Sequence, residues 1–319
     1  MLHNYARFVA AATIVLLFAG GMVTSTGSGL AVPDWPNSYG HFMFSFPLSK
    51  MVGGVFYEHG HRLIASTVGL LTIGLAVWLW LAERRRWVKR LGVIALAAVI
   101  LQGLLGGITV LFFLPAPVSI GHAGLAQIFF CLTIAIALVT SPGWRAGDGT
   151  DDPVTDRTLC RLATTLTVLI YVQILAGATM RHTDAGLAIP DFPLAFGHLV
   201  PPQWTAGIAI HFSHRLGAIA VLALAAVVIG RIRSRHRSRR ELLRPALLLG
   251  VLIAAQITLG ALTVLTQKAV LINSLHVVVG ALVLATSLVV TLRMFRARIA
   301  AAENACGAAP SLSMEVRTA

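Results

Sequence analysis

Charged residues are scarce in this sequence. Asp, Glu, Lys and Arg make up 12% of its 319 residues, whereas hydrophobic residues make up 57%. About a quarter of the residues of a soluble domain are usually charged. This composition therefore excludes a soluble domain and predicts an integral membrane protein. Acidic residues are the scarcer kind, because 12 Asp and Glu against 25 Lys and Arg give a formal net charge of +13. The basic residues flank apolar runs, which indicates membrane topology and argues against nucleic-acid binding.

Cysteine is also rare, with three in the whole chain. Cys131 lies inside an apolar run, Cys160 lies just before one, and Cys306 lies close to the C-terminus. The loops that we predict to face outward contain no cysteine, so we expect no disulfide. No cleavable signal is evident, and we interpret the first apolar run as a retained helix.

Eight apolar runs approach or exceed the length of about 20 residues that a helix needs to cross a bilayer. They cover approximately residues 8–26, 57–81, 91–113, 118–140, 162–180, 206–230, 245–266 and 271–295. The connections 83–90 and 231–240 are strongly basic, whereas 27–56 and 181–205 each contain a single Lys or Arg. The positive-inside rule therefore predicts a multi-pass protein of the cell membrane, with both termini cytoplasmic and the two long loops outside.

The chain contains an internal repeat. The segment GLAVPDWP at 29–36 matches GLAIPDFP at 186–193. Further matches follow in the same order: His61-Arg62 with His214-Arg215, Gln102 with Gln256, and His122 with His276. We predict an all-α fold of two tandem four-helix bundles, residues 1–150 and 151–319. A parallel repeat of this kind has a pseudo-twofold axis along the membrane normal. The polar stretch 141–161 is the predicted linker.

Four histidines stand near the starts of helices that enter from the outer side: His61, His122, His214 and His276. At a rise of about 1.5 Å per residue, the two members of each pair are level within about one turn. Two opposed imidazoles from two bundle helices are what a bis-histidine haem requires. A lone histidine would more simply cap a helix or lie at the interface, but four matched positions favour metal ligation. A zinc site would need three or four converging ligands, and no thiols lie nearby.

The two halves differ next to these histidines. Glu58 stands three residues before His61, whereas His211 stands three residues before His214. Residues three apart share a helix face, so we expect Glu58 to point into the cavity of His61. A carboxylate there can accept a proton or orient water, and the alternatives are an ion pair with Arg62 or a helix cap.

Arg62 and Arg215 each follow a histidine of the ligand type. The carboxylate side chains of a haem near the outer surface need cations, and arginine binds carboxylates bidentately. The alternative is an interfacial arginine whose head group reaches water.

Taken together, these residues resemble the haem A synthase family, from Gly20 to the eighth apolar run. The resemblance rests on Gly20-Gly21, residues 24–36, Glu58, His61-Arg62, residues 102–109, His122, His214-Arg215 and His276. It implies an enzyme that oxidises one methyl group of haem O to a formyl group, through successive hydroxylations and loss of water. The product, haem A, serves cytochrome oxidases.

The resemblance also implies roles for the histidines. His214 and His276, with Arg215, would hold a permanent haem b in the C-terminal half. His61 and His122, with Arg62, would line the site for the substrate haem O, and Glu58 would be the acid of that site. Because two imidazoles leave an iron no open position, the substrate must lack one of these ligands for part of the cycle.

One departure and several open points accompany the resemblance. Some members of the family carry a cysteine pair in an outer loop, and this chain has none there. A haem O synthase is the expected partner and lipid the surroundings, while the electron donor, the oxygen source, the oxidase served and a homo-oligomeric state stay open. The alternatives are a bis-histidine cytochrome b, which would need no Glu58, and a haem transporter, which would not explain the paired histidines.

Overall fold

The computed structural model of this protein describes residues 1–146, 154 and 156–307, with side chains as far as residue 300. Eight helices in this part of the chain are long and apolar enough to cross a membrane, as predicted. They are α1 (Leu2–Ser25), α2 (Gly54–Ala82), α3 (Arg86–Leu111), α4 (Ala116–Val139), α6 (Arg157–His182), α7 (Ala206–Arg235), α8 (Arg240–Leu265) and α9 (Val270–Gly307). The short α5 (Pro142–Ala146) follows α4, and most of the predicted linker, like the side chain of Cys306, lies outside the described residues.

The helices are longer than the apolar runs that predicted them. Helix α6 begins at Arg157, where Asp156 accepts a hydrogen bond from the backbone N–H of Leu159 at 3.0 Å. Helix α7 continues to Arg235, with two arginines in its last turn. Carboxylates at a helix N-terminus and cations at a C-terminus both stabilise the helix dipole, so polar residues extend these helices past the hydrophobic stretch.

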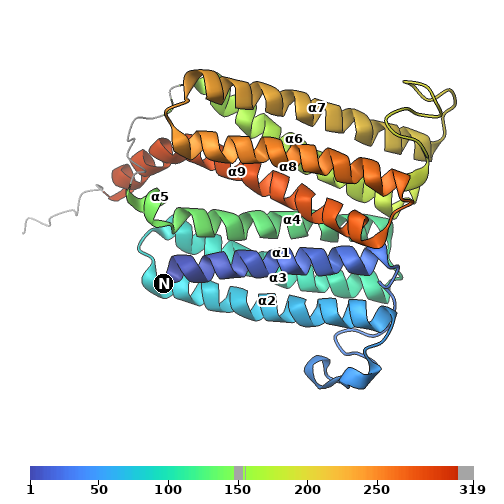
Figure 1. Cartoon of the computed structure of the whole chain (residues 1–319). Helices are drawn as coiled ribbons and strands as arrows, with labels where there is room; N and C mark the ends of the chain where they lie inside the picture. The colour runs from blue at the N-terminus through green and yellow to red at the C-terminus, as the bar shows by residue number, and fades with distance from the viewer. Residues whose placement is uncertain (147–153, 155, 308–319) are drawn as a thin grey trace, which may run out of the picture.

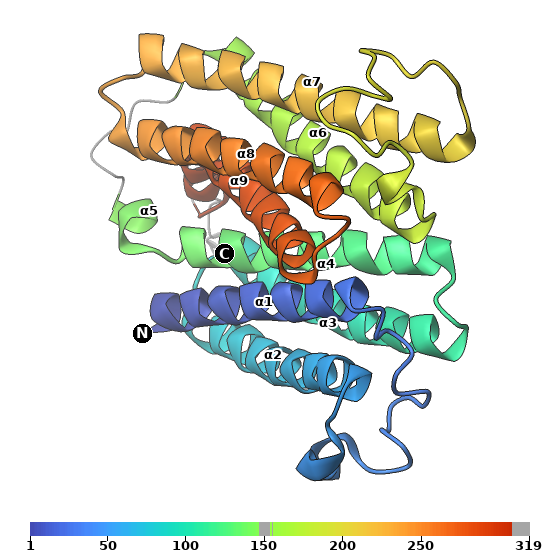
Figure 2. The same ribbon diagram turned by 45° about the vertical axis from the view of Figure 1, so that its right-hand side comes forward.

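The eight long helices form two closed bundles (Figures 1 and 2). Helices α1 to α4, the N-terminal unit, pack in a cycle in which each contacts the next and α4 returns to α1. Helices α6 to α9, the C-terminal unit, repeat that cycle. The units meet where α4 and α9 pack together, with α1 against α9 and α4 against α6. Exchanging α1 with α6 and α4 with α9 reproduces the same set of contacts, while the pseudo-twofold axis itself stays a prediction.

Each unit has its own buried hydrophobic cluster, and a third cluster lies between them. Phe130 of α4 is fully buried there, against Ala281 and Ala285 of α9. Small residues on α9 let the two helices approach closely, which is the usual way for helices to pack in a membrane. Helices α4 and α9, which carry His122 and His276, therefore hold the two units together.

The molecule has two distinct ends (Figure 1). The end that carries the loops 26–53 and 183–205 is called the loop end below, and the opposite end, with the turns 83–85 and 236–239, is called the basic end. The loop end contains the short helices η1 (Met43–Ser45), η2 (Leu48–Lys50) and η3 (Ala185–Leu187).

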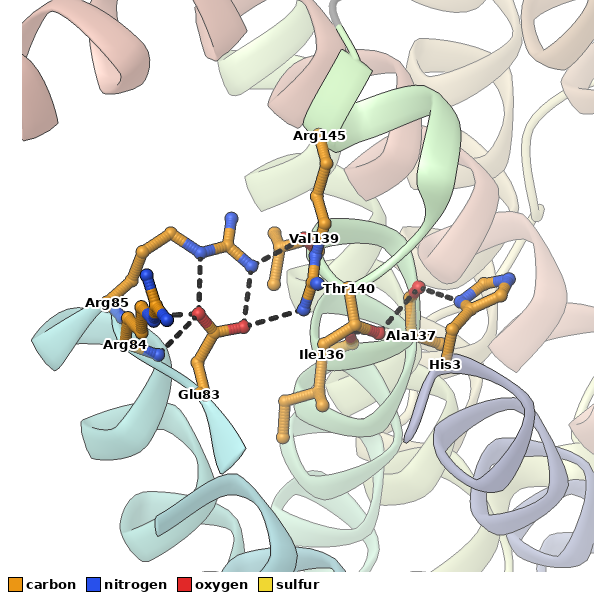
Figure 3. Close-up of polar contacts among 9 residues, drawn as sticks. All are labelled: His3, Glu83, Arg84, Arg85, Ile136, Ala137, Val139, Thr140 and Arg145. Atoms are coloured by element: carbon orange, nitrogen blue, oxygen red, sulfur yellow. Dashed lines mark hydrogen bonds and ion pairs between the residues drawn. The ribbon is translucent and has the colours of Figure 1, made fainter. Parts of the chain in front are cut away.

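At the basic end, Glu83 is a buried hub of ion pairs (Figure 3). Its carboxylate accepts hydrogen bonds from Arg85 at 2.9 Å and from Arg145 of α5 at 2.9 Å. Burial raises the pKa of Glu83, but the hydrogen bonds and the charges of Arg85 and Arg145 outweigh it and lower the pKa to about 2. Glu83 thus ties the α2–α3 turn to the segment that follows α4.

The loops 26–53 and 183–205 fold alike at their repeated motif. Each contains one cis-proline and one isolated antiparallel bridge. Asp34 accepts hydrogen bonds from the backbone N–H groups five and six residues later, at 2.7 and 2.8 Å, and Asp191 does the same at 2.8 Å for both. Burial raises the pKa of Asp34, but these N–H groups outweigh it and hold the pKa below its usual value. The two aspartates therefore close the same tight turn in both loops.

Candidate metal-binding sites

The four predicted ligand histidines lie at similar depths below the loop end. His61 is seven residues after the first residue of α2, and His122 is six residues after the first residue of α4. His214 and His276 are eight and six residues after the first residues of α7 and α9. These offsets correspond to depths of about 9 to 12 Å along the helices, so each pair is level within one turn, as predicted. The depth is greater than the sequence suggested, because α2 and α4 begin two or three residues earlier than their apolar runs.

Each of the four imidazoles faces a glycine on a neighbouring helix. A Cβ atom built on the facing glycine would lie only 2.9 to 3.3 Å from the imidazole Cε1. The pairs are Gly20 with His61, Gly106 with His122, Gly177 with His214, and Gly260 with His276. Such distances are shorter than ordinary carbon–carbon contacts, so any larger residue would push the ring aside. The absence of a side chain at these four positions therefore sets the position of every ring.

Within each unit the two imidazoles lie near each other. His61 and His122 are close enough to interact electrostatically, and so are His214 and His276. The Nδ1 atoms of His61, His122 and His276 are buried without a hydrogen-bond partner. A buried polar atom without a partner is costly, so protein groups alone do not satisfy these three rings.

His214 differs from the other three because its Nδ1 atom has a partner. The side-chain amide of Gln173 lies 3.1 Å from this atom and also donates to the backbone carbonyl of His214 at 2.7 Å. A second hydrogen bond on the far ring nitrogen fixes the orientation of a ligand histidine. Leu16 occupies the equivalent position in the N-terminal unit. Sequence analysis missed Gln173, although a polar residue inside an apolar run was the available signal.

Among the described residues, no group of three or more His, Cys, Asp or Glu is arranged to hold a metal ion. That finding gives no support to a zinc site of three or four protein ligands. The residues fit an iron porphyrin bound by a pair of imidazoles, because each unit supplies two level, half-buried histidines on helices that lie diagonally across the bundle. Unpartnered Nδ1 atoms and the glycine faces agree with that fit.

Glu58 lies buried beside the loop 26–53, where both of its oxygens are engaged. Oε1 pairs with the guanidinium of Arg62 at 2.6 Å, and Oε2 accepts the backbone N–H of Val32 at 2.8 Å. In the C-terminal unit, Nδ1 of His211 takes the matching position, 3.3 Å from the backbone nitrogen of Ile189. The ion pair that the sequence left as an alternative is therefore present, and the carboxylate is held one turn from His61.

Arg62 and Arg215 hold the loops. Arg62 donates to the carbonyl oxygens of three loop residues, at 2.7 to 3.0 Å, in addition to Glu58. Arg215 donates to three loop carbonyls in the same way, at 2.7 to 3.3 Å. A guanidinium has five N–H donors, so these bonds use most of the capacity that a haem carboxylate would require. The predicted binding role of the two arginines now competes with a clear structural role.

Comparison with known proteins adds independent information. The model of a family described as "Cytochrome oxidase assembly protein" (COX15-CtaA) matches residues 3–288 of this chain. A protein named "Heme A synthase" from Symbiobacterium thermophilum is 32% identical over 275 residues, which cover 83% of this chain and 87% of that protein. The protein of the same name from Geobacillus kaustophilus is 30% identical over 316 residues, 95% and 97% of the two chains. That from Shouchella clausii is 30% identical over 262 residues, 81% and 85%.

Proposed function

Because this chain belongs to the cytochrome oxidase assembly protein family (COX15-CtaA), we propose that it is a haem A synthase, a membrane oxidoreductase that converts haem O to haem A. One observation of the structure carries the proposal. Each unit holds a level pair of half-buried histidines against glycines, and in three of the four rings the buried Nδ1 atom has no protein partner. Two porphyrin sites in one body suit an enzyme with one resident haem and one haem substrate.

The C-terminal unit holds the resident haem b in this proposal. The imidazoles of His214 and His276 would hold its iron, and Gln173 fixes the orientation of His214 through its Nδ1 atom. Haem b supplies a one-electron redox centre when it is bound. The N-terminal unit lacks the equivalent of Gln173, so His61 has no such hydrogen bond on its Nδ1 atom, which suits a porphyrin that enters and leaves.

The N-terminal unit takes haem O as substrate, with His61 and His122 facing its iron. Glu58 lies one helical turn from His61 and is the acid–base group of the site, where it accepts the proton released as the methyl carbon is oxidised. Arg62 and the backbone N–H of Val32 hold its carboxylate in place. The C-terminal unit has His211 at the matching position and therefore lacks that carboxylate.

The same proposal places the protein in its membrane. The basic end faces the cytoplasm together with both termini, and the loop end faces outward in the cell membrane. A haem O synthase supplies the substrate, and haem A passes to a cytochrome oxidase during assembly. The oxidant that takes up the electrons of the methyl group, the oxygen source and any electron donor lie outside the chain.

The test is expression of the chain together with a haem O synthase in a host that makes no haem A, followed by haem extraction and chromatography. Haem A or its hydroxylated precursor is expected with the wild-type chain and with His198→Ala, an exposed loop histidine used as control. Neither compound is expected with His61→Ala. A wild-type extract that contains only haem b and haem O would reject the proposal and favour an electron-transfer cytochrome.

A further inference from the structure

An arginine without a counter-ion lies at the loop end between the two units. Arg181, the last residue but one of α6, is partly buried, and its Nη2 donates to the hydroxyl of Ser25 at 3.1 Å. Ser25 of α1 is also contacted at 3.1 Å by Asn273 and by Ser274 of α9. Ser274 stands two residues before His276, and Arg181 is close enough to His276 to act on it electrostatically. Three helices thus fix the arginine beside the C-terminal histidine pair.

The charge of Arg181 is unbalanced. Among the residues that the structure describes, no carboxylate lies within 4.0 Å of its guanidinium, and Ser25 is the one side chain to which it donates. A partly buried cation is costly unless an anion accompanies it, so an unpaired arginine in such a position is a candidate ligand-binding residue. Most of its five N–H donors are left for a ligand.

A second cation lies at the loop end of the C-terminal unit, and the loop end of each unit is called its rim below. Lys268, in the turn between α8 and α9, lies over the loop glycine Gly186, with its Cε atom 3.2 Å from a Cβ built there. In the N-terminal unit, Leu114 lies over Gly29 in the same manner, at 3.4 Å. The backbone of the two turns is alike, since Leu114 and Lys268 have φ angles of 58° and 66°. At this position the N-terminal unit has a neutral side chain and the C-terminal unit has a cation.

The counterpart of Arg181 in the N-terminal unit is a neutral residue, as Leu114 is the neutral counterpart of Lys268. Counting from the aligned loop motifs, Arg181 matches Thr24, whose hydroxyl donates to carbonyls of its own helix at 2.9 and 3.1 Å. The rim of the C-terminal unit therefore carries two cations where the N-terminal rim carries none at the equivalent positions. The arginines that follow the histidines do not make this difference, because both units have one and both hold loop carbonyls.

We infer that Arg181, assisted by Lys268, binds the propionate carboxylates of the porphyrin in the C-terminal unit. The inference rests on the proposed function, since it takes the ligand of His214 and His276 to be haem. It explains how one unit retains its haem while the other exchanges it. Carboxylate anchors at the C-terminal rim add to the two imidazoles, whereas the N-terminal rim offers no equivalent anchor at positions 24 and 114.

The test compares haem b with its dimethyl ester, in which both propionates are blocked. The full-length chain, produced under haem limitation and purified in detergent, is titrated with each compound and followed by the absorption of the low-spin complex. The wild type is expected to prefer the free acid. In Arg181→Gln the affinity for haem b falls about tenfold or more, because a charge-assisted hydrogen bond is lost, while the affinity for the ester is unchanged. Arg181→Lys keeps part of the preference.

Two further variants make the result decisive. Lys50→Gln removes an exposed cation of the other loop and leaves the preference intact. Lys268→Leu, which installs the residue found at the N-terminal rim, lowers the preference without touching the Arg181 cluster, and it serves if Arg181→Gln does not fold. Equal affinity losses for acid and ester, or no loss in either variant, would overturn the inference. The same titration of His276→Ala separates this outcome from a failure of the proposed function. If His276 is not a haem ligand, both compounds bind His276→Ala as well as they bind the wild type.

Discussion

Replacing the glycine that faces a ligand histidine tests whether the ring positions matter. Gly260 of α8 faces His276, and an alanine Cβ there would lie 3.1 Å from Cε1, 3.7 Å from Nδ1 and 3.9 Å from Nε2. Ordinary carbon–carbon contacts lie at about 3.5 to 4.0 Å, so the ring of His276 must retreat by roughly 0.5 Å in Gly260→Ala. Forced displacement of this kind costs about 1 to 3 kcal/mol in a packed interior.

Helix propensity acts in the opposite direction. Alanine in place of glycine within a helix stabilises it by about 1 kcal/mol. The free energy of unfolding of Gly260→Ala should therefore differ little from that of the wild type, while the position of the His276 ring changes directly. We expect haem b affinity to fall about tenfold, which corresponds to about 1.4 kcal/mol, and the low-spin absorption bands to shift.

The same helix provides the control. A Cβ on Gly250 would meet only the mobile end of Ile229, at 3.4 Å, which is ordinary contact. Gly250→Ala should therefore keep haem b and gain thermal stability. The assay is haem titration of both purified variants with thermal unfolding measured in parallel. Wild-type affinity and an unchanged spectrum in Gly260→Ala would refute the idea that these glycines set the rings.

Three further results are expected. Glu58→Gln should keep haem b and haem O but lower the haem A yield about a hundredfold in extracted pigment, and a wild-type yield at equal expression would reject a catalytic Glu58. Glu83 has a pKa lowered from 4.5 to about 2, so its contribution to stability is complete above pH 4.5 and disappears as the pH falls towards 2. The melting-temperature gap between wild type and Glu83→Gln should close over that range; a constant gap would contradict the ion-pair account. With the natural thiols removed, an impermeant reagent outside the cell should label Leu199→Cys, which replaces an 85% exposed side chain, but not Ser234→Cys, and the reverse pattern would invert the topology.

The number and the approximate bounds of the membrane helices follow from the sequence, because each helix is marked by an apolar run along most of its length. Eight spans were predicted from apolar length, and their errors are confined to the ends. Helix α6 begins five residues early, at Arg157, because Asp156 caps it, and capping depends on a single side chain and not on hydropathy. The level of the histidine pairs was predictable for the same reason, since His61 and His122 are counted from helix starts.

The contacts across helices were not predictable in the same way. The role of Arg62 depends on where the loop carbonyls of residues 32, 34 and 37 lie, and a linear sequence does not give that position. Gly260 and Gly20 face imidazoles because of the rotation of their helices, which the sequence does not give. From the sequence, Arg181 is only the single basic residue of the connection 181–205. Its lack of a counter-ion becomes visible only when α1, α6 and α9 are assembled.

The division of labour between the two histidine pairs is the central claim, and pigment analysis of two purified variants tests it most directly. Wild type, His61→Ala and His276→Ala are produced with a haem O synthase, and haems b, O and A are quantified per mole of protein. The account predicts that His61→Ala keeps haem b but contains no haem A, and that His276→Ala loses haem b. Unchanged haem b in His276→Ala, or haem A in His61→Ala at the wild-type level, would contradict it.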